Sequence, residues 1–167
     1  MSTYAPMECH LTTDRLVMRP WSADDAARLR DLHAERGDGT PALAETQRII
    51  EAQLTRTEAT GIALLPIRRS GESDFIGYCG LIIGRASLEE PEIAYELFQY
   101  AHGHGYATEA ARAILDAAAA TGRTRLWSTV RTWNTASFRV LEKLGFERDH
   151  TTTDDRGDLV WLTRTLP

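Results

Sequence analysis

The chain has 167 residues, of which 43% are hydrophobic and 26% are charged. This composition excludes a disordered chain, and the length is sufficient for one domain with a sizeable hydrophobic core. With 19 Lys and Arg residues against 24 Asp and Glu residues, the net charge is −5, which argues against a protein that coats nucleic acid regardless of its sequence.

Several further classes are excluded by residue usage. Two cysteines, Cys9 and Cys79, are too few for a disulfide framework or a zinc site, and no His, Asp or Glu cluster has metal-ligand spacing. The first ten residues lack the basic start and apolar block of a signal peptide, and no apolar stretch approaches the ~20 residues needed to cross a bilayer. We therefore expect a cytoplasmic protein without metal, membrane or direct nucleic-acid partners.

The first half of the chain predicts a strand, two helices and a hairpin. The expected elements are a strand at 13–19, a helix after Ser22, a helix from Pro41 to near Gly61, and strands at 61–67 and 75–83. Ser22 is a good N-cap, and Pro41 suits a first helical position. The second helix has an apolar stripe made of Leu43, Gln47, Ile50 and Leu54. Pro66 indicates an edge or a bulge in the strand that contains it.

The second half alternates strands and helices. The expected elements are a strand at 92–98, a glycine-containing loop at 99–105, a helix ending at Gly122, a strand at 125–130, a helix from near Ser137 to Gly145, a short strand at Phe146 and a last strand at 159–166. Together the two halves predict one mixed α/β domain over residues 1–167.

The loop at 102–110, HGHGYATEA, is the segment most informative about chemistry. A strand followed by two glycines and a helix start forms an anion site, because the unpaired first-turn amides lie at the positive end of the helix dipole. A tight turn between a strand and a helix would require the same glycines. A dinucleotide fold fits poorly, since Thr108 replaces the third small residue and Arg131, not an acid, follows the next strand. A phosphate-loop lysine is absent, because Lys143 is the only lysine.

Three segments together resemble a known family. The stretches EIAYELFQYAHGHGYATEAARAIL and STVRTWNTASFRVLEKLGFE resemble the acetyl-CoA-binding half of the GNAT superfamily of N-acetyltransferases, and TDRLVMRPWSADDAARL resembles its RimJ/RimL-type branch of ribosomal-protein N-terminal acetyltransferases. The resemblance spans residues 13–146 and is weakest at 36–61. It implies an α/β (α+β) GNAT fold with a mixed, mostly antiparallel sheet and splayed central strands. The acceptor side would be mainly 1–91 and the acetyl-CoA side mainly 92–146.

The resemblance also implies where acetyl-CoA binds. Leu97 and Phe98 would bond the pantetheine arm through main-chain groups. The pyrophosphate would lie on the amides of His102, Gly103, His104, Gly105, Tyr106 and Ala107. Two positions depart from the family pattern, because Tyr100 stands where an Arg or Gln is usual, and His102 where an aromatic residue is usual. These departures remove a side-chain contact but leave phosphate binding by main-chain amides intact.

Residues after the next strand would complete the cofactor side. The resemblance implies that Asn134 holds the pantetheine arm and that Ser137 lies near the sulfur. Arg139 and Lys143 lie four residues apart, so a cation on that helix face could meet the 3′-phosphate, although a solvated helix face is the alternative.

The chemistry expected of such a site is direct attack of an amine on the thioester, without a covalent enzyme intermediate. A main-chain amide on the splayed strand would bind the oxyanion. Ser137 is the candidate proton donor, or a helix N-cap, and Glu92 is the candidate base, or a solvated strand-end residue.

The acceptor stays open at this stage. A protein N-terminal α-amine is expected from the RimJ/RimL resemblance, and a small-molecule amine is the first alternative. A non-catalytic acyl-CoA sensor and an NAD(P)-dependent oxidoreductase are the others. A homodimer is also compatible with the sequence.

Overall fold

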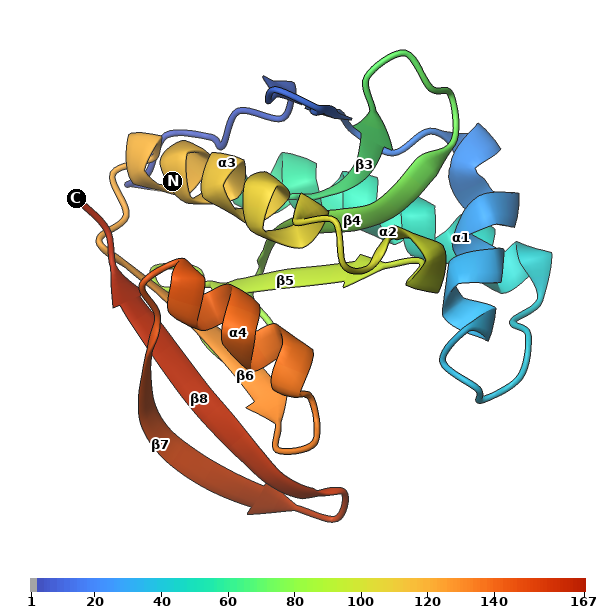
Figure 1. Cartoon of the computed structure of the whole chain (residues 1–167). Coiled ribbons are helices and arrows are strands. Elements are labelled where there is room, and N and C mark those ends of the chain that lie inside the picture. Colours follow the sequence, from blue (N-terminus) through green and yellow to red (C-terminus); the bar gives the residue numbers. More distant parts are fainter. Residues whose placement is uncertain (1–2) are drawn as a thin grey trace.

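The computed structural model of the chain describes residues 3–167, within which eight strands form one sheet (Figure 1). In chain order the elements are β1 (Leu11–Thr12), β2 (Leu16–Met18), α1 (Ala26–Ala34), α2 (Leu43–Thr60), β3 (Leu64–Arg69), β4 (Phe75–Ile82), β5 (Glu92–Leu97), α3 (Tyr106–Ala120), β6 (Arg125–Arg131), α4 (Thr135–Lys143), β7 (Glu147–Asp154) and β8 (Gly157–Thr165). Short 3-10 turns precede α1 and follow β5. The strand order is β1-β2-β3-β4-β5-β6-β8-β7.

The two central strands separate from each other. Among the strands of residues 3–167, β5 and β6 are the one parallel pair, and they are in register only at Glu92 and Trp127. Every other neighbouring pair is antiparallel, and β6 pairs with β8 over its full length. The predicted mixed, mostly antiparallel sheet with splayed central strands is therefore confirmed.

Helices cover both faces of the sheet. In Figure 1, α3 and α4 lie on the face nearer the viewer, where they bury one core cluster with Cys79, Ile93 and Leu162. On the other face α1 and α2 bury a second cluster, which includes Trp21 and Phe75, and Tyr78 of β4 packs against it. The side chains of one strand alternate between these two environments, as strand geometry requires.

Two predicted elements in the first half are revised by the structure. The strand expected at 13–19 is a short hairpin instead, because Thr13 N donates to Leu16 O and turns the chain between β1 and β2. Ser22 caps as predicted, and Asp25 returns the bond by accepting from Ser22 N at 2.9 Å. The predicted helix start at Pro41 is two residues early, since α2 begins after Ala42.

The apolar stripe predicted on α2 is only partly buried. Ile50 is 2% exposed and Thr46 is fully buried, whereas Leu43 and Leu54 are 40% and 41% exposed. The helix is therefore rotated relative to the predicted stripe, and two leucines remain on the surface. Gly61 ends α2 in the left-handed conformation with φ +76°, as expected of a C-cap glycine.

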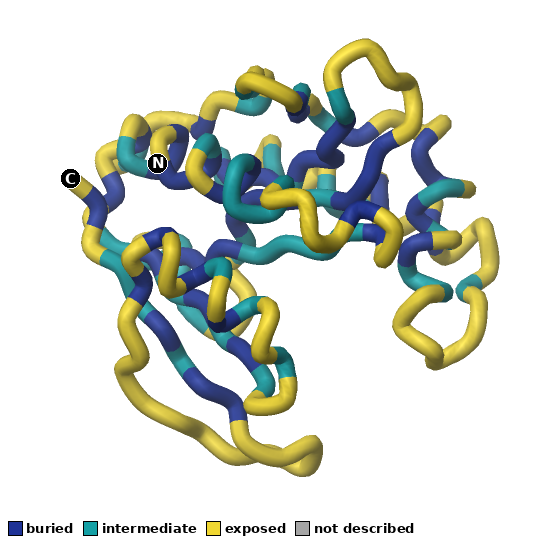
Figure 2. Tube along the Cα trace, in the orientation of Figure 1, coloured by how far each residue is buried: buried dark blue, intermediate teal, exposed yellow. Residues whose placement is uncertain are grey.

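The largest difference lies near the C-terminus. A short strand was expected at Phe146, but β7 runs for eight residues and is exposed along its whole length (Figure 2). Its sequence, ERDHTTTD, has no apolar alternation, because it lies at the edge of the sheet and buries nothing on either face. No helix within residues 3–167 is long and apolar enough to cross a membrane.

Candidate active site

The gap between β5 and β6 exposes main-chain groups of β5. Phe98 N donates to Ile76 O of β4, so the alternate residues of β5 direct their main-chain groups toward β6. Three contacts on the β6 side agree with this alternation: Trp127 N donates to Pro91 O, Ser128 Oγ to Ile93 O, and the His102 ring contacts Leu97 O. The amides of Tyr95 and Leu97 therefore face the region where the strands have separated.

Phe98 does not fit the role expected of it. Its N–H is bonded to Ile76, and its carbonyl accepts from Ala101 N at 3.0 Å. Its side chain is 5% exposed and belongs to the core under α1 and α2. Both main-chain groups of Phe98 are therefore already bonded within the protein, whereas the amides of Tyr95 and Leu97 face the gap.

The loop between β5 and α3 has the geometry of an anion site. Gly103 and Gly105 have φ +79° and +78°, a region that residues with a Cβ rarely adopt, and Gly105 is the N-cap of α3. The first-turn amides of α3 at Tyr106, Ala107 and Thr108 have no carbonyl within the helix to bond. With the two glycines they provide donors and a positive dipole end for a phosphate. His104 is exposed and its ring lies 5.5 Å from that of Tyr106.

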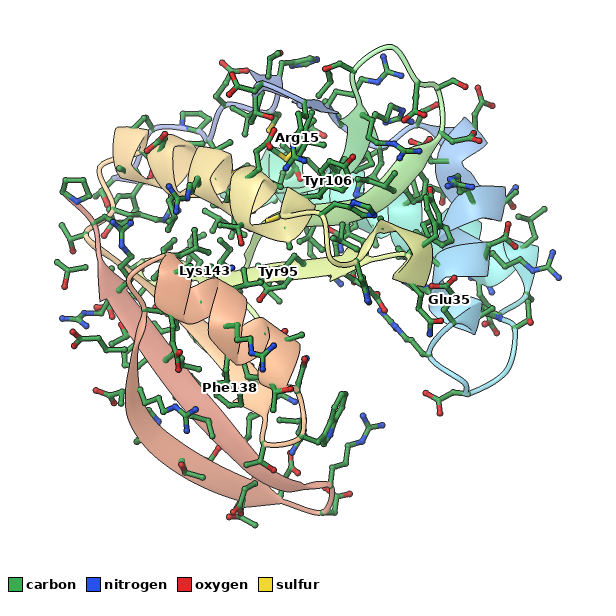
Figure 3. The ribbon with its side chains drawn as sticks, in the orientation of Figure 1. Arg15, Glu35, Tyr95, Tyr106, Phe138 and Lys143 are labelled. Atoms are coloured by element: carbon green, nitrogen blue, oxygen red, sulfur yellow. The ribbon has the colours of Figure 1, made fainter. Side chains whose placement is uncertain are left out.

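The start of α3 is held in place by the turn between β1 and β2. Glu109 accepts hydrogen bonds from Thr13 Oγ1 at 2.5 Å, from Arg15 N at 3.0 Å and from Arg15 Nε at 2.7 Å. Burial alone would raise the pKa of Glu109, but these bonds lower it overall. The Arg15 guanidinium also lies 4.5 Å from the Tyr106 ring centroid (Figure 3). Sequence reasoning missed Arg15, because nothing local shows that it contacts a loop ninety residues away.

A cavity of about 240 Å³ lies where β5 and β6 separate. Its walls are main-chain and side-chain atoms of β5, β6 and the first turn of α4. The lining residues include Glu92, Ala94, Tyr95, Thr129, Asn134 and Ser137. Residues distant in sequence, among them Glu92 and Ser137, thus share one cavity.

Glu92 is fixed at one end of this cavity. It is only 4% exposed, so the alternative of a solvated strand-end glutamate is wrong. Its Oε1 accepts from Thr129 Oγ1 at 2.6 Å, and its Oε2 accepts from the main-chain N of Arg85 at 2.5 Å. These partners lie on different elements, and they hold the carboxylate in one orientation.

The N-cap of α4 and the candidate proton donor are two different residues, Asn134 and Ser137. Asn134 caps α4, its Oδ1 accepting from Ser137 N at 3.2 Å. The alternative of Ser137 as the N-cap is therefore wrong, because Ser137 lies in the first helical turn. Both Asn134 and Ser137 line the cavity, and the Ser137 side chain lies within hydrogen-bonding reach of the Tyr95 hydroxyl.

Tyr95 is a cavity residue that the sequence analysis did not include among the site candidates. Its hydroxyl donates to Ser137 O at 3.3 Å and so links β5 to α4 (Figure 3). Burial raises the pKa of Tyr95 to about 12, which keeps the hydroxyl protonated at neutral pH. An alternating strand position shows that a residue is half-buried, but not that its polar tip reaches the next element.

The remaining candidates lie outside the cavity. Arg139 and Lys143 are exposed on α4, and neither forms an ion pair within the described part of the chain. Cys79 is buried in the core, and burial raises the pKa of its thiol, so it is a poor nucleophile. Among residues 3–167 no three His, Cys, Asp or Glu side chains are grouped to hold a metal ion.

The geometry is matched by known structures. A GnaT-family acetyltransferase from Bordetella pertussis superimposes with a TM-score of 0.83 at 23% identity, covering 94% of this chain and 99% of that chain. An acetyltransferase from Agrobacterium tumefaciens is 27% identical, with a TM-score of 0.78 and 98% of both chains covered. RimL, a ribosomal L7/L12 α-N-protein acetyltransferase solved with coenzyme A, gives 0.82 at 15% identity, covering 95% of this chain and 98% of that chain.

No curated protein matches the sequence. The family model described as an acetyltransferase (GNAT) domain does match, over residues 15–147, and this confirms the family expected from the sequence. The gap, the glycine loop and the cavity are suited to a long phosphorylated arm with its reactive end between β5 and β6. The chain therefore belongs to the GNAT family and is an acetyl-CoA-dependent N-acetyltransferase.

Proposed function

We propose that the protein acetylates the N-terminal α-amine of a peptide or protein, with residues 92–146 binding mainly acetyl-CoA and residues 1–91 contributing mainly to the acceptor side. The observation that carries this proposal is the shared cavity, in which the fixed Glu92 carboxylate and the Ser137 side chain lie beside main-chain groups of β5. The similarity to RimL supports the choice of a protein N-terminus.

The cofactor would be held mainly by main-chain groups. The amides from His102 to Ala107 would bind the pyrophosphate, with Tyr95 and Leu97 bonding the arm and Asn134 Nδ2 assisting. The acetyl end would then lie in the cavity, where a β5 amide can bind the developing oxyanion. Arg139 is the nearest uncommitted arginine on α4 for the 3′-phosphate.

Two side chains would move protons. Glu92 is the proposed base, which takes a proton from the acceptor's ammonium group directly or through one water, so that the neutral amine can attack the thioester carbonyl. Ser137 is the proposed donor to the departing thiolate, and its carbonyl is already tied to Tyr95. Since nothing is transferred to the enzyme, the chain needs no nucleophile, which agrees with the inert, buried Cys79.

The surface beside the cavity suits a chain-like acceptor. Trp127 is in register with Glu92, and Trp161 is in register with Thr129, so these indoles lie on the same sheet face as the proposed base. Their ring centroids are 5.9 Å apart, and both N–H groups are bonded, to Glu90 and to Thr152. Rigid half-buried rings of this kind bind extended polypeptide well.

An acceptor screen tests the proposal. Release of the coenzyme A thiol would be measured with unblocked N-terminal peptides, the same peptides N-acetylated, polyamines, aminoglycosides and free amino acids. We expect turnover with unblocked peptides only. Turnover with small amines alone would establish the small-molecule alternative, and tight coenzyme A binding without any turnover would establish an acyl-CoA sensor. Thermal stabilisation by NAD(P) but not by coenzyme A would contradict the whole assignment.

A further inference from the structure

A second carboxylate of β5 is bonded to an arginine from outside the sheet. Arg36 donates to Glu96 through Nε at 2.9 Å and through an Nη at 2.6 Å. Tyr78 donates its hydroxyl to the same carboxylate at 2.9 Å. A two-pronged guanidinium bond and a phenol thus converge on one carboxylate that the proposed reaction does not use.

Glu96 lies on the acceptor face of the strand. Tyr78 is in register with Glu96 and packs against the core of α1 and α2, so both side chains are on the face opposite α3. Glu92 and Ala94 share that face by alternation. Glu92 and Glu96 are four positions apart along the strand, which is about 13 Å at ~3.3 Å per residue.

Arg36 comes from the connection between α1 and α2. Glu35, which precedes it, accepts a hydrogen bond from Gln99 N at 2.9 Å, so this connection contacts the end of β5 twice (Figure 3). Residues 37–40 are exposed, and Gly37 and Gly39 both have positive φ. The side chains of Glu35 and Arg36 thus connect the start of this segment to Gln99, Glu96 and Tyr78.

The ion pair between Arg36 and Glu96 is accessible enough to be exchanged. The Glu96 side chain is 24% exposed, and the Arg36 side chain is 47% exposed. Pairs this close to solvent contribute little net stability, so another cation can replace the guanidinium at small cost. The carboxylate is partly buried, however, so leaving it unpaired is unfavourable and a replacing cation is favoured.

We propose that Glu96 and Tyr78 form a subsite for a positively charged side chain near the N-terminus of the acceptor, and that Arg36 fills this subsite until the acceptor binds. This inference rests on the proposed function and defines its acceptor more narrowly. The spacing from Glu92 separates the subsite from the reacting amine. A Lys or Arg at the second to fourth position of an extended peptide has the reach to fill it, because three such residues span ~10 Å.

The test uses two hexapeptides that differ only at the third residue, lysine in one and norleucine in the other. Wild type is expected to have the lower KM for the lysine peptide. Glu96→Gln should raise that KM about tenfold, because a charge-assisted bond is lost, and leave the KM for the norleucine peptide and for acetyl-CoA unchanged. Arg36→Ala should lower the KM for the lysine peptide, since the internal competitor is gone.

The KM for the lysine peptide is expected to rise in Glu96→Gln and to fall in Arg36→Ala, and these opposite changes distinguish a subsite from a purely structural ion pair. A purely structural ion pair would be broken equally by either variant, so parallel changes with both peptides would overturn the proposal. Tyr78→Phe is a milder substitution for the case in which Glu96→Gln has a strongly lowered melting temperature. It should also raise the KM for the lysine peptide and not for the norleucine peptide. Glu142→Gln is the matched control, because it removes a surface carboxylate of α4 that is paired with Arg148 of β7. It should leave the KM for both peptides unchanged.

The experiment also distinguishes failure of the proposed function from failure of the proposed subsite. If wild type acetylates spermidine but neither peptide, the proposed acceptor class is wrong. The KM values of Glu96→Gln and wild type are then compared for spermidine and for butylamine. A KM that rises in Glu96→Gln for spermidine but not for butylamine supports the cationic subsite. Equal KM values for the variant and wild type on both amines reject it.

Discussion

The proposed cofactor side and the proposed acceptor side of this molecule are built from different groups. Around the glycine loop the donors are main-chain amides, and the residues that shape them are consecutive in sequence, from His102 to Ala107. On the acceptor side the groups are side chains from separate elements, such as Glu92 with Thr129, and Arg36 with Glu96. A site made of backbone tolerates many sequences, while a site made of side chains depends on a few identities.

The largest effect is expected from the acceptor side. Glu92→Gln keeps the shape but removes the proposed base, so kcat should fall about 100-fold with an unchanged KM for acetyl-CoA. Steady-state kinetics with the best acceptor peptide measure this effect. Glu89→Gln, an exposed carboxylate three residues earlier, is the control and should retain full activity. A kcat within twofold of wild type would remove Glu92 from the mechanism.

Ser137→Ala tests the second proton transfer. Because Ser137 lines the cavity and is the proposed proton donor, loss of its hydroxyl should lower kcat about tenfold, with little change in either KM. Thr135→Ala, at the exposed first position of the same helix, provides a matched hydroxyl deletion without expected effect. If both variants retain wild-type kcat, the thiolate takes its proton from elsewhere, and Tyr95→Phe becomes the next variant to measure.

Substitutions in the glycine loop test whether the cofactor side depends on backbone alone. Gly105→Ala places a Cβ at φ +78°, which costs roughly 1–2 kcal/mol and reorients the first amides of α3, so the Kd for acetyl-CoA should rise about tenfold. Gly157→Ala has comparable strain at the start of β8, outside the loop between β5 and α3, and should lower the melting temperature without changing that Kd. His104→Ala should be nearly silent. A larger loss from His104→Ala than from Gly105→Ala would contradict a main-chain site.

The smallest effect is expected from Glu109, which connects the first turn of α3 to the turn between β1 and β2. The pKa of Glu109 is lowered in the folded state, so its contribution to stability is present above its ordinary value of 4.5 and disappears as the pH falls through that range. Glu109→Gln should therefore lower the melting temperature by a few degrees at pH 7 and by less at pH 4. A difference between the two proteins that is the same at both pH values would show that the charge has no role.

The fold was largely readable because its elements have local signatures. Gly61 and Gly122 follow the ends of helices, Ser22 is an N-cap, and apolar runs mark β3 to β6. Two features were not readable. The strand β7 carries no apolar alternation, since it is an edge strand that buries nothing, and the stripe on α2 depends on how far that helix is rotated against its neighbours.

For the site, the sequence alone indicated the loop at 102–107 as a candidate anion site, because its two glycines and the helix start are consecutive in the chain. It also indicated Glu92 and Ser137 as candidates, but not their surroundings. Only the tertiary structure showed that Phe98 is already bonded, that Tyr95 reaches α4, and that Glu109 holds Arg15. The physical reason is that local backbone conformation is encoded by neighbouring residues, whereas contacts between side chains are decided by how distant elements pack.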